Sequence, residues 1–170
     1  PPPGKKIIQA DLSGIESRTS DHYTFHINPE RIKKTKMPYF DAHTEISVSS
    51  GLMTKGQEVF FIFSGAKKDN PELEVETFSE LYKPDEETYK LLSLPKEEQK
   101  EWMNKLKVVR SKGKTTNYAS LYLVGANTLS KNLEITKKEA QELIDAYWKI
   151  HFAVKEFTET LKVIEVDGED

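Results

Sequence analysis

The sequence carries its clearest pattern in one stretch, Arg110-Ser-Lys-Gly-Lys-Thr-Thr-Asn-Tyr-Ala-Ser-Leu-Tyr122. Within it, Arg110, Lys114, Tyr118 and Tyr122 recur every four residues. On an α-helix a four-residue step drifts by only about 40° around the axis, so these side chains project from one broad face. Two cations at this spacing suit a polyphosphate, and two aromatic rings offer flat surfaces for a base or sugar. The stretch predicts a helix that binds a nucleoside triphosphate along its length.

A simpler interpretation of the stretch is a solvated helix with two ordinary basic residues and two half-buried tyrosines. Its centre contains weak helix formers, namely Gly113, Thr115, Thr116 and Asn117. Because intrinsic propensity does not favour a helix there, a contact with another segment must do so. The nucleotide-binding interpretation therefore needs support from elsewhere in the chain.

Three further segments provide this support. The Arg-x-x-x-Lys-x-x-x-Tyr-x-x-x-Tyr spacing resembles the nucleotide-binding fingers helix of family A DNA polymerases. Asp11-Leu-Ser-Gly-Ile-Glu-Ser-Arg18 resembles the first palm motif of that family, and Asp41-Ala-His43-Thr-Glu resembles its Asp-x-His segment. The segment Leu133–Tyr147 is similar to the helix that follows in these enzymes, and Thr136-Lys-Lys-Glu139 at its start has the form of a capping box. Four segments in family order are more specific than any one alone.

The resemblance implies an α/β (α+β) fold that is mainly helical. Residues 1–18 would hold a palm strand and the first catalytic motif, and residues 19–170 would form a helical fingers subdomain. Lys5–Ala10 has the β-branched centre of a short strand, which would deliver a carboxylate at its end. The segment at about 58–104 departs from the family pattern and is predicted to be a fingers insertion. We favour a solvated elaboration over a partner-binding surface for this insertion.

Local patterns add detail to this outline. Within the predicted insertion, the apolar run Glu58–Phe63 fits a strand or a helix turn, and Pro95–Leu106 fits a charged helix. Asp41 is expected to cap a helix. Gly125 is expected to form the turn or C-cap after the nucleotide-binding helix. The remaining histidines, His22, His26 and His151, match no motif and are interpreted as structural.

The resemblance implies a metal site and a sugar-selecting residue. Asp11 and the Leu12 backbone carbonyl would bind Mg²⁺, a hard cation that takes few protein ligands besides substrate phosphates. Glu16 would fill the space of a ribose 2′-OH, so that deoxynucleotides are selected, and Tyr122 would hold Glu16 by a hydrogen bond.

The resemblance also implies how the nucleotide is held. His43, Arg110 and Lys114 would bind the triphosphate, and Lys114 would in addition be catalytic by protonating the leaving pyrophosphate. Tyr118 would stack near the base and sugar, and a tyrosine at this position implies acceptance of dideoxynucleotides.

A family A active site uses two Mg²⁺ ions, one at the primer 3′-OH and one at the pyrophosphate. The second carboxylate that they require comes from a His-Asp-Glu hairpin, a triplet that does not occur in these 170 residues. We therefore expect this chain to be inactive on its own. Its expected partners are dNTP and primer-template DNA. The remaining polymerase polypeptide would supply the second palm carboxylate and the thumb.

Composition sets wider bounds. The formal net charge of −3 gives no global sign of nucleic-acid binding, although five basic residues cluster between Lys105 and Lys114. The absence of cysteine excludes disulfides and thiolate metal sites. No apolar run is long enough to span a membrane, so we expect a cytoplasmic protein, in the bacterial host if it is phage-encoded. The Pro-Pro-Pro-Gly start suggests an excerpt or one piece of a larger polypeptide.

Two alternatives remain open at this stage. A single-subunit RNA polymerase fragment has a similar helix, but Glu16 argues against it because an RNA enzyme would not fill the 2′-OH pocket. A non-catalytic nucleotide- or nucleic-acid-binding module could keep the same fold without the chemistry.

Overall fold

In a computed structural model, residues 15–161 are described and form ten α-helices, with no strand in that range. The helices are α1 (Ile15–Tyr23), α2 (Pro29–Thr35), α3 (Ala42–Ser49), α4 (Lys55–Asp69), α5 (Val75–Tyr82), α6 (Glu86–Leu92), α7 (Lys96–Leu121), α8 (Ala126–Leu133), α9 (Lys137–Ile150) and α10 (Phe152–Thr160). The mainly helical prediction is confirmed over this range. The predicted palm strand, Lys5–Ala10, lies outside it.

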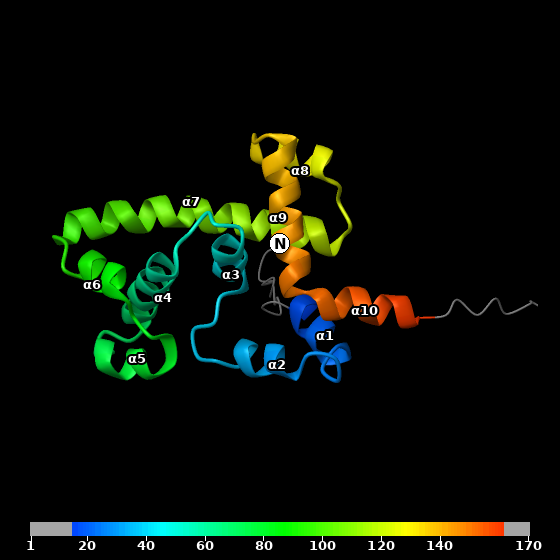
Figure 1. Ribbon diagram of the computed structural model, residues 1–170. Helices are drawn as coiled ribbons and strands as arrows, with labels where there is room; N and C mark the ends of the chain where they lie inside the picture. Colours follow the sequence, from blue (N-terminus) through cyan, green and yellow to red (C-terminus); the bar gives the residue numbers. More distant parts are fainter. Residues whose placement is uncertain (1–14, 162–170) are drawn as a thin grey trace, which may run out of the picture.

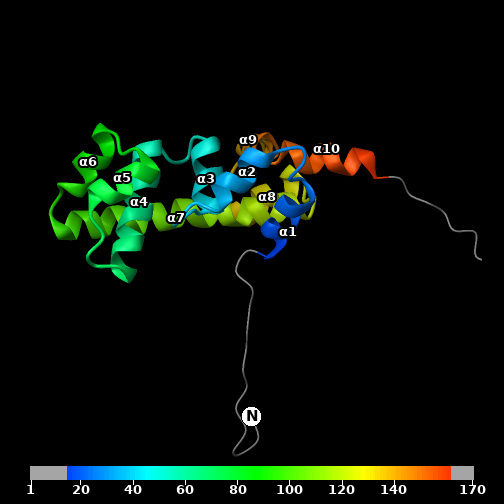
Figure 2. The same ribbon diagram turned by 90° about the horizontal axis from the view of Figure 1, so that it is seen from below.

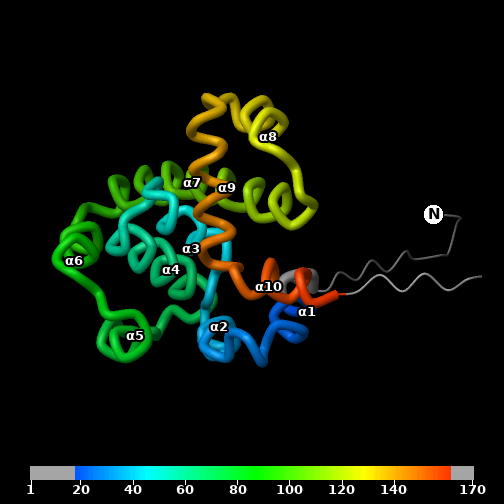
Figure 3. Tube along the Cα trace, turned by 45° about the vertical axis from the view of Figure 1, so that its right-hand side comes forward, coloured from blue at the N-terminus to red at the C-terminus, as the bar shows by residue number. Residues whose placement is uncertain are grey.

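Helix α7, 26 residues long, is the axis of the structure. Helices α4, α5 and α6 lie at its N-terminal end, and α8, α9 and α10 lie toward its C-terminal end (Figure 1, Figure 2). Helix α3 lies beside its middle, and α9 crosses it (Figure 3). The sequence predicted separate helices before and after about residue 106, but the two are continuous. The predicted end of the insertion, near residue 104, therefore falls inside a helix.

Helix α3 approaches α7 closely at Gly113. A Cβ atom on Gly113 would lie 2.2 Å from the carbonyl oxygen of His43 and 2.5 Å from Oγ of Ser47. The Ser47 hydroxyl lies 3.0 Å from that His43 oxygen and 3.3 Å from the carbonyl oxygen of Val109, so it can donate across the crossing. This contact explains why a weak helix former occupies the middle of α7: only glycine lets the two backbones meet.

Three apolar clusters hold helices α4 to α9 together. One joins α4 to α5 around Phe63 and Phe78, a second joins α4 and α6 to α7 around Phe60 and Met103, and a third joins α7, α8 and α9 around Leu129. The run Glu58–Phe63 is thus helical. Its apolar side chains are buried except for that of Phe61, which is partly buried, because α4 lies between two clusters.

The predicted helix starts are confirmed. Asp41 caps α3 by accepting hydrogen bonds from the backbone N–H groups of His43 and Thr44. Thr136 and Glu139 form the expected capping box at the start of α9.

The predicted exit from α7 is wrong. Leu123, not a glycine, takes the left-handed conformation (φ 58°) after the helix. The Val124 N–H bonds to the Ala119 carbonyl oxygen at 2.8 Å and the Leu123 N–H to that of Ser120 at 3.0 Å, the pattern of a Schellman motif. Gly125 instead precedes α8 as its N-cap residue, with an extended backbone.

A buried ionic cluster ties α1 and α2 to α3. Arg31 of α2 is 6% exposed and pairs with Asp21 of α1 (Nε to Oδ1 3.5 Å) and with Glu45 of α3. Lys34 adds a second, half-exposed cation beside Glu45. Burial raises the pKa of Asp21 despite the attraction of Arg31, whereas for Glu45 the nearby cations outweigh burial and lower the pKa.

His151 lies beside this cluster, at the junction of α9 and α10. Its ring stacks on Tyr147 with centroids 4.4 Å apart, and it is 5% exposed. His22 and His26, in contrast, are exposed. Burial, with a smaller contribution from Arg31, lowers the His151 pKa from 6.5 to about 4. His151 is therefore neutral at pH 7.

The approach of α3 to α7 predicts that Gly113→Ala destabilises the protein. The added methyl group must push the two backbones apart, an overpacking effect of about 1–3 kcal/mol. Urea unfolding followed by circular dichroism measures this loss. Gly65→Ala is the matched control, because nothing lies within 4 Å of its Cβ and it should gain up to about 1 kcal/mol. Equal effects of the two substitutions would contradict this account of the crossing.

Neutral, buried His151 predicts that stability falls in acid. Its folded pKa of about 4 lies below the ordinary 6.5, so its contribution is complete above pH 6.5 and is lost as pH falls toward 4. The free energy of unfolding should drop by about 2 kcal/mol between pH 7 and pH 5. His151→Phe keeps a ring against Tyr147 and should remove most of this drop.

The comparison is made by urea unfolding at several pH values. Glu45, with its lowered pKa, acts in the same direction as His151, and Asp21, with its raised pKa, acts in the opposite direction. Their effects are common to both proteins, so the difference between the two curves reports His151. His22→Phe controls for the substitution itself at an exposed position. An unchanged pH dependence in His151→Phe would refute the assignment.

Candidate nucleotide-binding site

The predicted face of α7 is present for three of its four residues. Arg110, Lys114 and Tyr118 lie at four-residue spacing within the helix, whereas Tyr122 is the residue that caps its end. Tyr118 and Arg110 are partly buried, Lys114 is exposed, and Tyr122 is 67% exposed. The helical geometry therefore extends from the two cations to the first aromatic ring.

Arg110 is oriented by Asp41. Its Nε lies 2.6 Å from Oδ2 of Asp41, while Oδ1 of the same carboxylate accepts the N–H groups of His43 and Thr44 at 2.9 and 3.1 Å. One carboxylate thus caps α3 with one oxygen and holds the guanidinium with the other. The sequence predicted the cap but gave no signal for the ion pair, because the two residues lie far apart in the chain.

His43 enters the same surface from α3. Its ring centroid is 6.0 Å from that of Tyr118. Its Nδ1 is buried and has no hydrogen-bond partner among the described residues. Burial lowers the His43 pKa; Asp41 opposes the shift, and Arg110 and Lys114 reinforce it. The lowered pKa means that the His43 ring loses its proton more readily than an exposed imidazole, and its Nδ1 remains an unused polar atom.

Lys114 provides an exposed cation on this surface. Its Nζ lies 6.0 Å from the centre of the Tyr118 ring, a loose cation–π contact. It makes no ion pair with the side chains that the structure describes. The Asp41 carboxylate offsets the charge of Arg110, and Lys114 leaves the surface with positive charge.

The structure thus gathers four predicted residues, His43, Arg110, Lys114 and Tyr118, on two helices. Asp11 and Leu12 lie outside the described residues. Glu16 lies within α1, but its side chain is not described, so its hydrogen bond to Tyr122 remains a prediction. Within residues 15–161, no group of three or more His, Cys, Asp or Glu residues is arranged to hold a metal ion. In the same range, no helix is long and apolar enough to cross a lipid bilayer.

Such an arrangement can bind a polyanion attached to a flat group. Arg110 Nε bonds to Asp41, which leaves the two terminal nitrogens of the guanidinium without hydrogen bonds to the described side chains. These nitrogens, the Lys114 ammonium and the His43 ring can donate to phosphate oxygens. Tyr118 offers a ring next to them.

Comparison with known proteins identifies the family. A family model for DNA polymerase family A matches residues 76–166, more than half of the chain. This match includes all of α7 and Tyr122, as well as part of the predicted insertion, and it does not extend to Asp11, Glu16 or His43. No curated protein and no solved structure gave a significant match. By the match over residues 76–166, the chain belongs to DNA polymerase family A.

Proposed function

We propose that this chain supplies the dNTP-binding surface and the first palm carboxylate of a DNA polymerase. The reaction is nucleotidyl transfer from a dNTP to a primer 3′-OH on a DNA template. One observation carries the proposal: His43 of α3 and Arg110, Lys114 and Tyr118 of α7 meet on one surface that keeps unpaired positive charge. The domain division predicted from the sequence, palm in 1–18 and fingers in 19–170 with an insertion at about 58–104, is part of this proposal.

The proposed triphosphate ligands all keep hydrogen-bonding groups that no described side chain uses. Lys114 is exposed and makes no ion pair with the described side chains, so it can bind a phosphate without breaking a contact. Arg110 is already fixed through Nε, which reduces the side-chain entropy lost when its terminal nitrogens bind. Nδ1 of His43 is buried and has no partner among the described residues, and a phosphate or an ordered water would satisfy it. The proton that Lys114 carries could pass to the leaving pyrophosphate.

Tyr118 and His43 form the part of the surface proposed to contact the sugar and base. Their rings lie 6.0 Å apart and tilted by 46°, so they form an angled wall beside the cations. A sugar and base packed against this wall would place the phosphates toward α7. Tyr122 and Glu16 are proposed to close the sugar side and to exclude a 2′-OH.

Asp11 and the Leu12 carbonyl are the proposed ligands of Mg²⁺. Both are hard oxygen donors, a set that fits Mg²⁺ in chemistry because this ion uses few protein ligands beside phosphates. When bound, Mg²⁺ supplies Lewis acidity at the 3′-OH and the pyrophosphate. The second palm carboxylate is proposed to come from another polypeptide segment, because these 170 residues contain no His-Asp-Glu triplet.

Nucleotide binding should depend on Lys114. Lys114→Gln removes a charge-assisted hydrogen bond to phosphate and should weaken the affinity for a fluorescent dNTP analogue about tenfold or more. Lys105→Gln makes the same change on the opposite side of α7 and is the matched control. Equal losses in the two variants would show that only general charge matters, and no loss in either would count against the site.

Catalysis should require both this chain and a second carboxylate. Mg²⁺-dependent primer extension is expected only when the chain is mixed with a polypeptide that carries the missing palm segment. Asp11→Asn in the mixture should lower the rate by orders of magnitude while dNTP binding persists. Extension by the chain alone would refute the split arrangement. Unchanged rates in Asp11→Asn would favour a non-catalytic binding module, and incorporation of ribonucleotides would favour an RNA polymerase.

A further inference from the structure

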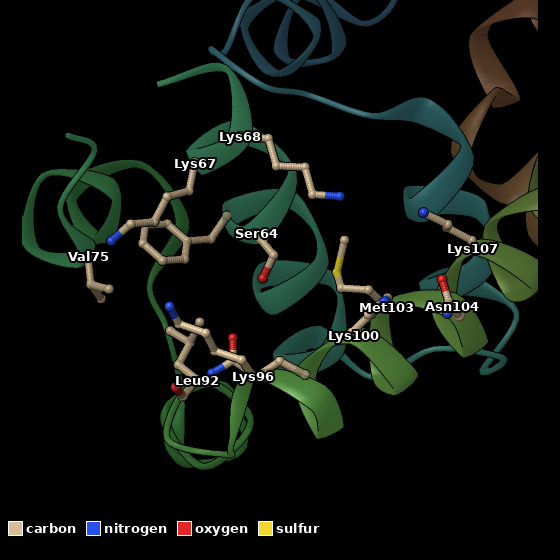
Figure 4. A pocket seen from close by; sticks show the side chains of 12 residues that line it. Ser64, Lys67, Lys68, Val75, Leu92, Lys96, Lys100, Met103, Asn104 and Lys107 are labelled. Carbon is tan, nitrogen blue, oxygen red and sulfur yellow. Dashed lines mark hydrogen bonds between the residues drawn. The ribbon is translucent and has the colours of Figure 1, made fainter. Parts of the chain in front are cut away.

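A hollow of about 620 Å³ lies between α4 and the N-terminal half of α7, and we call it the α4–α7 hollow. Figure 4 shows Lys67 and Lys68 extending from α4 on one side of it, and Lys100 and Lys107 extending from α7 on the other. With Lys96, the lining holds five lysines and, among the described residues, no carboxylate. The α4–α7 hollow is therefore a positively charged surface.

Charges of opposite sign are separated around this part of α7. Lys96, Lys100 and Lys107 lie within about 40° of one another around the helix axis. The glutamates of the same segment, at positions 97, 98 and 101, lie about 60° or more away from these lysines. A helix that only had to stay hydrated could mix its charges and form ion pairs four residues apart. Solvation alone therefore does not explain the lysine side of α7.

The five lysines also lack partners that would explain their gathering. All are exposed, and none makes an ion pair with the side chains that the structure describes. Lys67 has a weak contact, with its Nζ 5.6 Å from the centre of the Phe63 ring. Because like charges repel, gathering five of them around one hollow costs free energy that a bound anionic partner would recover.

The floor of the hollow is apolar and mainly aliphatic. Val75 and Leu92 are half-buried there, and Phe63 and Met103 are buried. The Phe63 side chain is 3% exposed, so its ring offers almost no face on which a nucleobase could stack. Aliphatic side chains need only apolar surface that leaves water. The floor therefore favours apolar amino-acid side chains over nucleobases.

Two polar side chains among the lysines suit a peptide backbone. Ser64 of α4 and Asn104 of α7 line the hollow, and their hydroxyl and amide groups can both donate to and accept from peptide groups. Gln99 is instead used within the chain, because its amide donates to the carbonyl oxygens of Leu92 and Leu94. The lining thus combines cations, apolar surface and hydrogen-bonding groups.

We propose that the α4–α7 hollow binds an acidic segment of another protein, one that carries apolar side chains among its carboxylates. The carboxylates pair with the lysines of α4 and of α7, and the apolar side chains lie on the floor between them. The predicted insertion is then a partner-binding surface rather than a solvated elaboration. This inference goes beyond the proposed function and does not depend on it, because the hollow contains no residue of the nucleotide-binding surface.

The apolar floor is tested with two fluorescein-labelled octapeptides and the full 170-residue chain, with binding measured by fluorescence anisotropy. One peptide alternates glutamate with leucine and the other alternates glutamate with serine, so their charges are equal. The glutamate–leucine peptide should bind at least about tenfold more tightly, because only its side chains can cover the floor. Equal affinities, or no binding of either peptide, would overturn the proposal.

The lysines are tested with the triple variant Lys68→Gln, Lys100→Gln, Lys107→Gln. It should bind the glutamate–leucine peptide about tenfold more weakly at low salt, because three exposed ion pairs are lost. The thermal unfolding midpoint shows whether this hollow variant is folded. An unchanged affinity in the folded variant would place the peptide elsewhere and refute the assignment.

The matched control changes one exposed lysine on each of α8, α9 and α10, namely Lys131→Gln, Lys149→Gln and Lys155→Gln. The net charge is the same in both triple variants. A loss of affinity confined to the hollow variant supports the proposal, whereas equal losses would mean general electrostatic attraction and would overturn it.

Two further measurements separate the peptide from other anionic ligands. If labelled oligothymidylate binds more tightly than the peptide and loses its affinity in the hollow variant, the occupant is a nucleic acid and the proposal falls. Lys114→Gln should bind the peptide as the unchanged chain does, because Lys114 lies about 10 Å along α7 from Lys107 and exposed charges at that distance are largely screened. A loss as large as that of the hollow variant would place the peptide on the nucleotide-binding surface. The effect of Lys114→Gln on dNTP binding is a separate readout, so this inference and the proposed function can fail independently.

Discussion

The contact between α3 and α7 at Gly113 is the constraint on which the rest of the site depends. Two backbones approach so closely there that a single methyl group would collide with the His43 carbonyl oxygen and the Ser47 hydroxyl. This approach sets how far His43 stands from Tyr118 and brings Asp41 within hydrogen-bond reach of Arg110. A wider crossing would leave α7 with its cations but would separate them from the imidazole and the carboxylate of α3.

Charged side chains are paired in the interior of the molecule and largely unpaired along α7. In the interior, Arg31 is paired with Asp21 and Glu45, since an unpaired buried charge would be strongly destabilising. Along α7 the opposite holds: Lys114 and the lysines of the α4–α7 hollow are exposed and carry no carboxylate partners among the described side chains. The interior pairs stabilise the fold, and the unpaired surface cations are available to anionic ligands.

Asp41 links the two kinds of interaction. Its carboxylate caps α3, which stabilises the helix end, and it fixes the Arg110 side chain without covering the terminal nitrogens of the guanidinium. A residue that serves local structure thereby prepares a binding group on another helix. The family match over residues 76–166 includes Arg110 but not Asp41, so this pairing is visible only in the folded chain.

The sequence by itself determined the local features of this protein: the helical face of Arg110, Lys114 and Tyr118, the Asp41 cap, the capping box at Thr136 and the family resemblance. These depend on residues a few positions apart, where periodicity and capping rules apply. Only the tertiary structure decided that α7 is continuous, that Leu123 ends it, that Asp41 pairs with Arg110 and that lysines of α4 and α7 surround one hollow. Each of these depends on packing between segments distant in the chain, and packing can override local propensity, as it does at Gly113.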